Sequence, residues 1–160
     1  MGTSVDIIAG FRNKDIIILE DEMRAASENL ILVTDDGSNG KKGFVTDALK
    51  EQIEAGVNYD LVIAIGPLMM MKAVCDLTKQ HNIKTIISMN PIMIDGTGMC
   101  GGCRLTVGGK TKFACVDGPD FDGHQVDFDE AIMRSRTYKE QEERETREFN
   151  CRLMEGAKNA

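Results

Sequence analysis

The sequence lacks the features that mark a membrane or secreted protein. No apolar run approaches the ~20 residues that a membrane-spanning helix needs. The N-terminus has no basic segment followed by an apolar stretch, so it does not resemble a secretory signal. The five cysteines are an odd number, whereas a small secreted disulfide scaffold usually has an even one. These absences predict a cytoplasmic protein.

Positive charge is also scarce. The 19 basic and 26 acidic residues give a formal net charge of −7, and the only close basic groupings are Lys41 with Lys42 and Lys110 with Lys112. Such a balance argues against a nucleic-acid or anionic-membrane surface, so neither is expected as a partner. The chain shows no Ser–His–Asp set and no carboxylate pair that spacing alone supports, so no catalytic residue is predicted.

The first 90 residues alternate between short apolar strands and amphipathic helices. Strands are expected at residues 5–10, 30–33, 61–65 and 84–88, and helices at residues 15–26, 44–55 and 67–80. This order is typical of a parallel sheet covered on both faces. In such sheets ligands bind at the carboxyl ends of the strands, where residues 34–38 and 66–67 are expected.

The composition changes after Pro91 to glycine-rich loops. Residues 105–107 and 111–114 are expected to pair across the turn at residues 108–109. A final helix is expected to begin at Asp127, with Glu130 completing its cap, and its far part is almost wholly charged. The chain therefore divides into a region of alternating strands and helices (1–91), a glycine- and cysteine-rich segment (92–126) and a C-terminal helix and tail (127–160).

Cys100, Cys103 and Cys115 lie close together in this glycine-rich stretch. Three thiolates are one ligand short of the usual four-ligand metal site, so the fourth ligand decides the metal. With Asp95 the site could hold a [2Fe–2S] cluster, and with His124 it could hold a structural zinc. Without a metal, Cys100 and Cys103 could form a dithiol pair, as in thioredoxin-like proteins. Spacing alone leaves all three interpretations open.

These cysteines belong to a longer series of motifs. The main one reads Asp-Gly-Thr-Gly-Met-Cys-Gly-Gly-Cys-Arg at residues 95–104, and the others occupy residues 32–38, 43–47, 64–67, 90–93, 107–109, 113–119 and 121–124. Together they resemble the flavin and [2Fe–2S] alpha subunit of NADH-dependent ferredoxin:NADP+ oxidoreductases, also known as sulfide dehydrogenase. Similar proteins are the electron-transfer subunit of dihydroorotate dehydrogenase B and the diaphorase subunit of cytosolic hydrogenases. The resemblance covers residues 5–140.

The resemblance implies a set of cluster ligands, which are Asp95, Cys100, Cys103 and Cys115. In the oxidoreductase branch an aspartate and three cysteines have this spacing, whereas the dihydroorotate branch has a cysteine where Asp95 stands. Asp95 therefore favours the oxidoreductase branch. An oxygen ligand is also expected to make the cluster more exchangeable than an all-thiolate one.

The resemblance further implies a partial NAD(P)H site, made by Arg12, Thr34, Asp35, Asp36, Gly37, Gly66 and Pro67. Residues 34–37 would lie near the nicotinamide ribose, residues 66–67 would open the helix beneath the nucleotide, and Arg12 would meet the adenosine side. Each also has a plain structural interpretation. Residues 34–37 could be only a turn with a helix cap, residues 66–67 only a helix start, and Arg12 only a surface charge.

Members of this family begin with a flavin-binding barrel and the opening strand, glycine loop and helix of a nucleotide domain, and neither is recognisable here. The expected fold is α/β: a Rossmann-like parallel sheet of the ferredoxin-reductase NAD-binding type with its first strand missing, an iron–sulfur loop region, and a C-terminal helix. This resembles a C-terminal fragment, a split protein or a degenerate paralogue. FAD is expected in the full-length subunit only, so this chain alone is expected to show little or no turnover. The open strand edge is expected to favour a homodimer.

The resulting hypothesis is an electron-transfer module of an NAD(P)H- and FAD-dependent iron–sulfur oxidoreductase. Nicotinamide moves hydride while a [2Fe–2S] cluster moves single electrons, so such a chain would relay electrons singly to a larger iron–sulfur flavoprotein subunit or to ferredoxin. Two alternatives remain. One is a zinc-bound structural or interaction module, and the other is a nucleotide-binding regulator that kept residues 34–37 but lost redox chemistry.

Overall fold

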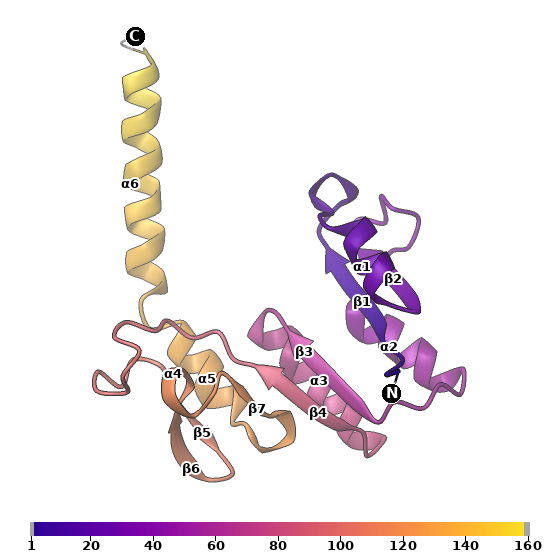
Figure 1. Ribbon diagram of the computed structural model, residues 1–160. Helices are drawn as coiled ribbons and strands as arrows, with labels where there is room; N and C mark the ends of the chain where they lie inside the picture. Colours follow the sequence, from indigo (N-terminus) through magenta and orange to yellow (C-terminus); the bar gives the residue numbers. More distant parts are fainter. Residues whose placement is uncertain (1, 159–160) are drawn as a thin grey trace. The chain divides into compact units, whose positions relative to one another are not determined.

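The computed structural model describes residues 2–158, which form an α/β protein (Figure 1). By their contacts they divide into two compact units. The first comprises the chain up to Val62 together with Ala73–Thr85, and the second comprises Ile63–Lys72 and the chain from Ile86 onward. Both units draw on the predicted nucleotide-binding region, and the boundaries at residues 91 and 126 remain predictions.

The elements of the first 90 residues follow the predicted alternation. They are β1 (Asp6–Phe11), the 3-10 helix η1 (Lys14–Ile16), α1 (Glu20–Ala26), β2 (Asn29–Thr34), α2 (Val45–Glu54), β3 (Leu61–Ile65), α3 (Leu68–Gln80) and β4 (Lys84–Ser88). The four predicted strands are confirmed to within a residue or two. The mixed α/β class is confirmed as well.

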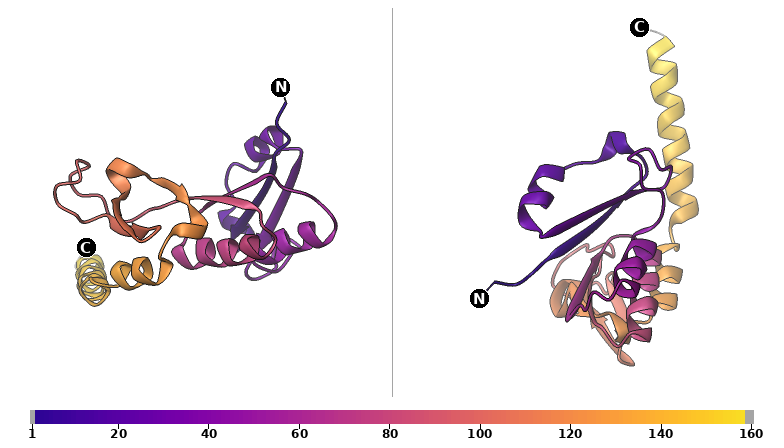
Figure 2. Two further views of the ribbon diagram at one scale, coloured as in Figure 1. Left: turned by 90° about the horizontal axis from the view of Figure 1, so that it is seen from below. Right: turned by 90° about the vertical axis from the view of Figure 1, so that its right-hand side faces the viewer.

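The remaining elements are short except for the last two helices. They are β5 (Arg104–Val107), β6 (Lys110–Phe113), α4 (Ala114–Asp117), β7 (Asp120–Asp122), the 3-10 helix η2 (Gly123–Gln125), α5 (Phe128–Ser135) and α6 (Lys139–Lys158). Figure 2 shows α5 and α6 as separate helices. The predicted cap is confirmed, since the Asp127 carboxylate accepts a hydrogen bond from the Glu130 N–H at 2.9 Å.

The described strands form three small sheets rather than one. β1 and β2 pair in parallel, with Phe11 opposite Thr34 at their carboxyl ends. The second sheet has the order β3-β4-β7, in which β7 runs antiparallel to β4 and was not predicted. The third is the predicted hairpin of β5 and β6 across Gly108 and Gly109, both of which have positive φ. Glycine suits that turn because it adopts positive φ without strain.

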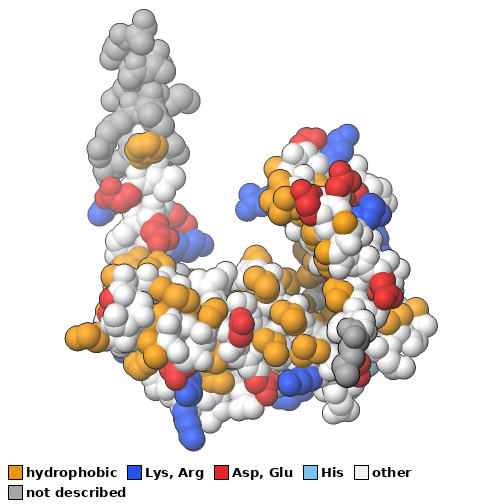
Figure 3. All heavy atoms as spheres, in the orientation of Figure 1, with side chains coloured by type: hydrophobic (Ala, Val, Ile, Leu, Met, Phe, Trp, Pro, Cys, Tyr) orange, Lys and Arg blue, Asp and Glu red, His pale blue; other side chains and the backbone are white. Residues whose placement is uncertain are grey.

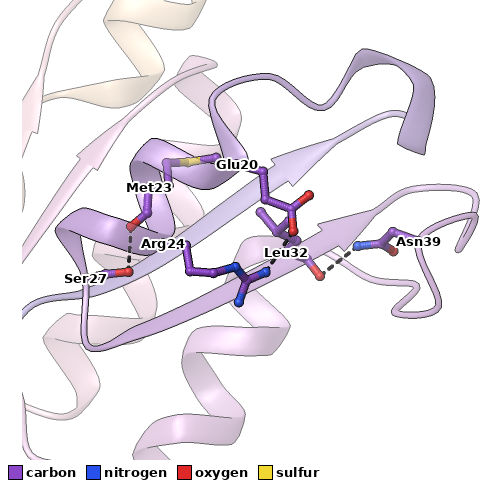
Figure 4. A network of polar contacts seen from close by, with 6 residues as sticks. All are labelled: Glu20, Met23, Arg24, Ser27, Leu32 and Asn39. Atoms are coloured by element: carbon purple, nitrogen blue, oxygen red, sulfur yellow. Dashed lines mark hydrogen bonds and ion pairs between the residues drawn. The ribbon is translucent and has the colours of Figure 1, made fainter.

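The single helix predicted at residues 15–26 is wrong over its first half. The chain makes the short turn η1, then leaves the helical conformation until α1, with Leu19 at φ 55° just before it. Three consecutive isoleucines at residues 16–18 explain the break, because β-branched side chains lose rotamer freedom in a helix. Within α1 an Arg24–Glu20 ion pair at 2.8 Å and a hydrogen bond from Ser27 to the Met23 carbonyl support the remaining turns (Figure 4).

One face of β3 carries exposed apolar side chains. Leu61, Ile63 and Ile65 are 40%, 61% and 70% exposed, whereas Ala64 between them is buried. Side chains alternate along a strand, so the three exposed residues share a face. Figure 3 shows hydrophobic side chains gathered over this part of the molecule. No helix among the described residues has both the length and the apolar character needed to cross a membrane.

Candidate metal centre

The β5–β6 hairpin brings two of the predicted ligand cysteines into contact. Cys103 precedes β5 and Cys115 follows β6, and the pairing of Arg104 with Phe113 continues into a hydrogen bond from the Ala114 N–H to the Cys103 carbonyl at 3.2 Å. The two Sγ atoms are 3.3 Å apart, and the Cys115 N–H points at the Cys103 sulfur from 3.5 Å. The Cys103 side chain is 1% exposed. The hairpin therefore holds this thiol pair in place through its own backbone.

The other two predicted ligands lie on the preceding loop and are linked to each other. Asp95 accepts the Thr97 N–H on Oδ1 at 2.9 Å and the Cys100 N–H on Oδ2 at 2.7 Å. The Cys100 sulfur in turn accepts the Gly102 N–H at 3.4 Å. Both Asp95 and Cys100 are exposed. The carboxylate thus closes the loop that presents the Cys100 thiol.

Backbone N–H groups favour the charged forms of two of these ligands. The pKa of Asp95 is lowered, first by the hydrogen bond from the Thr97 N–H and then by that from Cys100. Burial acts to raise the pKa of the Cys103 thiol, but hydrogen bonds from the Cys115 backbone and thiol outweigh it and the pKa falls. The pKa of the Cys115 thiol is raised, chiefly because it donates to Cys103. Within the pair, the Cys103 thiol is therefore the more acidic.

Two residues that the sequence did not indicate secure the same region. The Asp117 carboxylate accepts the Phe113 N–H at 2.8 Å and pairs with the Lys112 ammonium at 3.0 Å, and both contacts lower its pKa, the backbone bond most. Arg134 on α5 donates to the Gly102 carbonyl at 3.4 Å. Asp117 thereby ties α4, the short helix that contains Cys115, to the end of β6. No local sequence signal marks these contacts, since each depends on how the chain folds back.

The four predicted ligands do not all converge. Over residues 2–158 no group of three or more histidine, cysteine, aspartate or glutamate side chains is arranged closely enough to hold a metal ion. The structure brings Cys103 to Cys115 and ties Asp95 to Cys100, which gives two pairs rather than one closed site. His124 lies in η2, where its N–H donates to Asp122 at 3.0 Å.

The predicted nucleotide residues after β2 form a tightly hydrogen-bonded loop. Thr34 is fully buried, and its hydroxyl donates to Asn39 Oδ1 at 2.8 Å. Asn39 Nδ2 reaches back to the Leu32 carbonyl at 3.0 Å (Figure 4). Asp36 accepts the Ser38 hydroxyl and N–H on one oxygen, and these bonds, the hydroxyl first, lower its pKa. Asn39, which the sequence reasoning missed, organises this loop, and the signal for it was the turn-forming Asn-Gly dipeptide at residues 39–40.

The other predicted nucleotide residues are split between the units. Arg12 follows β1 and its carbonyl accepts the Asp36 N–H at 3.3 Å, within the first unit. Gly66 and Pro67 precede α3 in the second unit, where the Pro67 carbonyl accepts the Met71 N–H at 3.0 Å. Pro67 thus stands directly before the first residue of α3, and its carbonyl accepts a hydrogen bond from the first turn.

Comparisons with known proteins place this chain beside electron-transfer proteins. Residues 90–127 match the iron–sulfur cluster binding domain of dihydroorotate dehydrogenase B. An uncharacterised protein of the adh 3′ region of Clostridium beijerinckii is 54% identical over 142 residues, covering 88% of this chain and 48% of that protein. A Thermotoga maritima homologue of the electron transfer subunit of dihydroorotate dehydrogenase B (NAD+) is 47% identical over 141 residues, covering 88% of this chain and 49% of its own.

A solved structure is also similar to this chain. The NADH-dependent reduced ferredoxin-NADP oxidoreductase, studied for flavin-based electron bifurcation, superposes with a TM-score of 0.81 at 43% identity, over 92% of this chain and 53% of its own. The resemblance read from the motifs is thereby confirmed. The chain spans about half the length of the curated relatives it matches.

Proposed function

Because the chain is related to the electron transfer subunits of dihydroorotate dehydrogenase B and carries their iron–sulfur cluster binding domain at residues 90–127, we propose that it is an electron relay. In this proposal it holds a [2Fe–2S] cluster through Asp95, Cys100, Cys103 and Cys115. The cluster, when bound, supplies transfer of one electron at a time. The contact between the Cys103 and Cys115 sulfurs is the observation that carries the proposal.

The spacing of that contact suits two ligands of one metal ion. Two thiolates bound at about 2.3 Å to a tetrahedral metal lie about 3.8 Å apart, close to the 3.3 Å between these sulfurs. Cys103 and Cys115 would hold the cluster as one pair of ligands, and Asp95 and Cys100, joined by the loop hydrogen bond, as the other. Thiolate and carboxylate donors suit iron, and in this proposal the pair beside the hairpin and the pair on the loop would approach each other to hold the cluster.

Backbone N–H groups of the chain donate hydrogen bonds to two of these ligand sulfurs. The Cys115 N–H donates to the Cys103 sulfur and the Gly102 N–H donates to the Cys100 sulfur. Such hydrogen bonds stabilise thiolates and set the potential of a cluster that they hold. The Cys103 side is covered by protein while Cys100 and Asp95 are exposed, so electrons would leave or enter on the loop side.

The same proposal includes a partial NAD(P)H site at the carboxyl ends of the strands. Residues 34–37 present a loop whose shape is fixed by Asn39, and Gly66 with Pro67 opens α3. Arg12 is exposed beside the loop. FAD would belong to the longer subunit, of which this chain matches about half.

The proposed partner is a larger iron–sulfur flavoprotein subunit or ferredoxin. The relatives are named as electron transfer subunits, which implies a second subunit to which electrons pass. We further propose that the exposed face of β3, carrying Leu61, Ile63 and Ile65, supports pairing with a second copy when no other strand covers it.

Anaerobic reconstitution with iron and sulfide tests the proposal. The expected result is broad absorption between about 400 and 600 nm and an S = ½ electron paramagnetic resonance signal after dithionite reduction. Asp95→Ala should perturb both, whereas Cys151→Ser, which alters a cysteine outside the proposed set, should leave them unchanged. A colourless protein with one zinc ion per chain would instead support the structural module built on His124.

A further inference from the structure

The contact between Cys103 and Cys115 has a second chemical consequence that does not need a metal. The two sulfurs are 3.3 Å apart, and the strand pairing of Arg104 with Phe113 keeps their backbones together. Cys103, just before β5, is buried, while Cys115, in α4 just after β6, is partly exposed. A small adjustment of the side chains would therefore bring the sulfurs to bonding distance without moving the hairpin.

We propose that Cys103 and Cys115 are a reversible redox-modification site, oxidised to a disulfide by hydroperoxides when no metal is bound. The disulfide removes two ligand sulfurs at once, so the oxidised chain accepts no cluster until a dithiol reduces it. This last effect rests on the proposed function, whereas the disulfide itself rests on the hairpin alone.

The chemistry balances with the peroxide as the only oxidant. The Cys103 side chain is 1% exposed, so the peroxide meets the sulfur of Cys115, which gives up its proton as it attacks one peroxide oxygen; the O–O bond breaks, and a sulfenic acid and one water form. The Cys103 sulfur then attacks the sulfenic sulfur, the S–S bond forms, the S–O bond breaks, and a second water leaves. Two thiols and one hydrogen peroxide thus give one disulfide and two waters.

Cys100 is the third thiol of this region, and the proposal excludes it from the disulfide. It is the most exposed thiol of the three, and its sulfur accepts the Gly102 N–H, whereas the Cys103 and Cys115 sulfurs contact each other. A dithiol pair within the Cys-Gly-Gly-Cys turn would use Cys100 and Cys103 instead. The geometry favours Cys103 with Cys115, and the two pairings give different products.

Peptide mapping of the full chain distinguishes them. The protein is freed of metal with chelator and reductant, desalted without oxygen, and treated with one equivalent of hydrogen peroxide. Free thiols are alkylated before digestion with trypsin. Cleavage then yields residues 85–104, with Cys100 and Cys103, and residues 113–134, with Cys115. A linked pair of these two peptides, separated again by dithiothreitol, is the expected product.

Three serine variants assign the link. Cys100→Ser should keep the linked peptide, and Cys103→Ser and Cys115→Ser should lose it. In Cys103→Ser the unresolved sulfenic acid at Cys115 should be trapped by dimedone. A link that survives in Cys103→Ser but disappears in Cys100→Ser would overturn the assignment, as would alkylation of Cys100, Cys103 and Cys115 alike after peroxide.

Cluster loading separates this inference from the proposed function. The oxidised chain should gain no visible absorption on reconstitution, and dithiothreitol should restore it. If the reduced chain loads a cluster but no disulfide ever forms, the present inference is wrong and the proposed function stands. If the disulfide forms and the reduced chain never loads iron, the redox site stands and the proposed function is wrong.

Discussion

At the scale of single residues, Asp6 shows how one carboxylate ties distant parts of the chain together. Its Oδ2 accepts the Tyr59 hydroxyl at 2.9 Å and its Oδ1 accepts Asn29 Nδ2 at 2.8 Å. The bonds join the start of β1 to the start of β2 and to the segment before β3. Burial, followed by the bond and the negative charge of Asp6, raises the pKa of Tyr59 to about 12. The neutral phenol is therefore the form that the fold stabilises.

The raised pKa predicts a loss of stability at high pH. A group whose pKa is raised on folding contributes its full stabilisation below the unfolded pKa, here about 10, and loses it as the pH rises through about 12. Tyr138→Phe leaves Tyr59 as the sole tyrosine, so absorbance at 295 nm should titrate near pH 12 in the folded chain and near 10 in urea. Equal midpoints in the two conditions would contradict the bond.

Residue types and spacing left the fourth ligand open, and the resemblance to a known family supplied the four proposed ligands, but neither indicated how they are linked. Asp95 stands out in the motif because of its resemblance to a known ligand, yet its two bonds to backbone N–H groups follow from the path of the loop. The contact between Cys103 and Cys115 likewise needed the hairpin register, which places Cys103 opposite Ala114 and so beside the next residue, Cys115. Sequence spacing had instead suggested Cys100 with Cys103 as the alternative dithiol.

At the scale of elements, the loop after β2 depends on one side chain. Asn39 accepts the Thr34 hydroxyl and the Lys41 N–H on Oδ1, and donates through Nδ2 to the Leu32 carbonyl. Thr34 is fully buried, so its hydroxyl has no water to replace the lost partner. The loop that carries the proposed nucleotide residues is therefore held to β2 by the hydrogen bonds of Asn39.

Asn39→Ala should destabilise the chain by about 2 kcal/mol, because it leaves buried polar groups without partners. Asn39→Asp keeps the acceptor for Thr34 but loses the donor to Leu32, so it should lie between wild type and alanine. Ser4→Ala, at an exposed position, serves as the control. Urea unfolding measures the differences, and an Asn39→Ala midpoint equal to that of the control would show that the loop is not held this way.

Elements with a strong local pattern were predicted well, and the failures had local causes. The strands and the helices α2 and α3 follow their apolar runs closely, and the glycine pair at residues 108–109 fixed the hairpin. The helix expected from residue 15 was broken by three isoleucines, which a pattern of apolar positions does not penalise. β7 escaped prediction because three residues carry almost no periodic signal, and only pairing with β4 makes them a strand.

At the scale of the whole molecule, the exposed face of β3 leaves apolar surface open. Parallel sheets are normally covered on both faces, and Leu61, Ile63 and Ile65 are not. If a second copy covers them, Ile63→Glu should abolish self-association by placing a charge in that contact. Ile18→Glu, at a 65% exposed residue that is not part of β3, should have no such effect. Sedimentation equilibrium over a range of concentrations decides, and a wild type that stays monomeric throughout would make the pairing wrong.

The two strands of the β5–β6 hairpin are close together in sequence, which affects the order in which parts of the chain fold. Its two cysteines are only 12 residues apart, whereas β4 and β7 must bring Ile86 to Asp122. Hairpins close within about 1–10 μs, and contacts between distant parts of a chain form later. We therefore expect a newly made chain to present its sulfur pair early, while the sheet beside it is still assembling. From that moment iron and oxidants compete for the same two atoms.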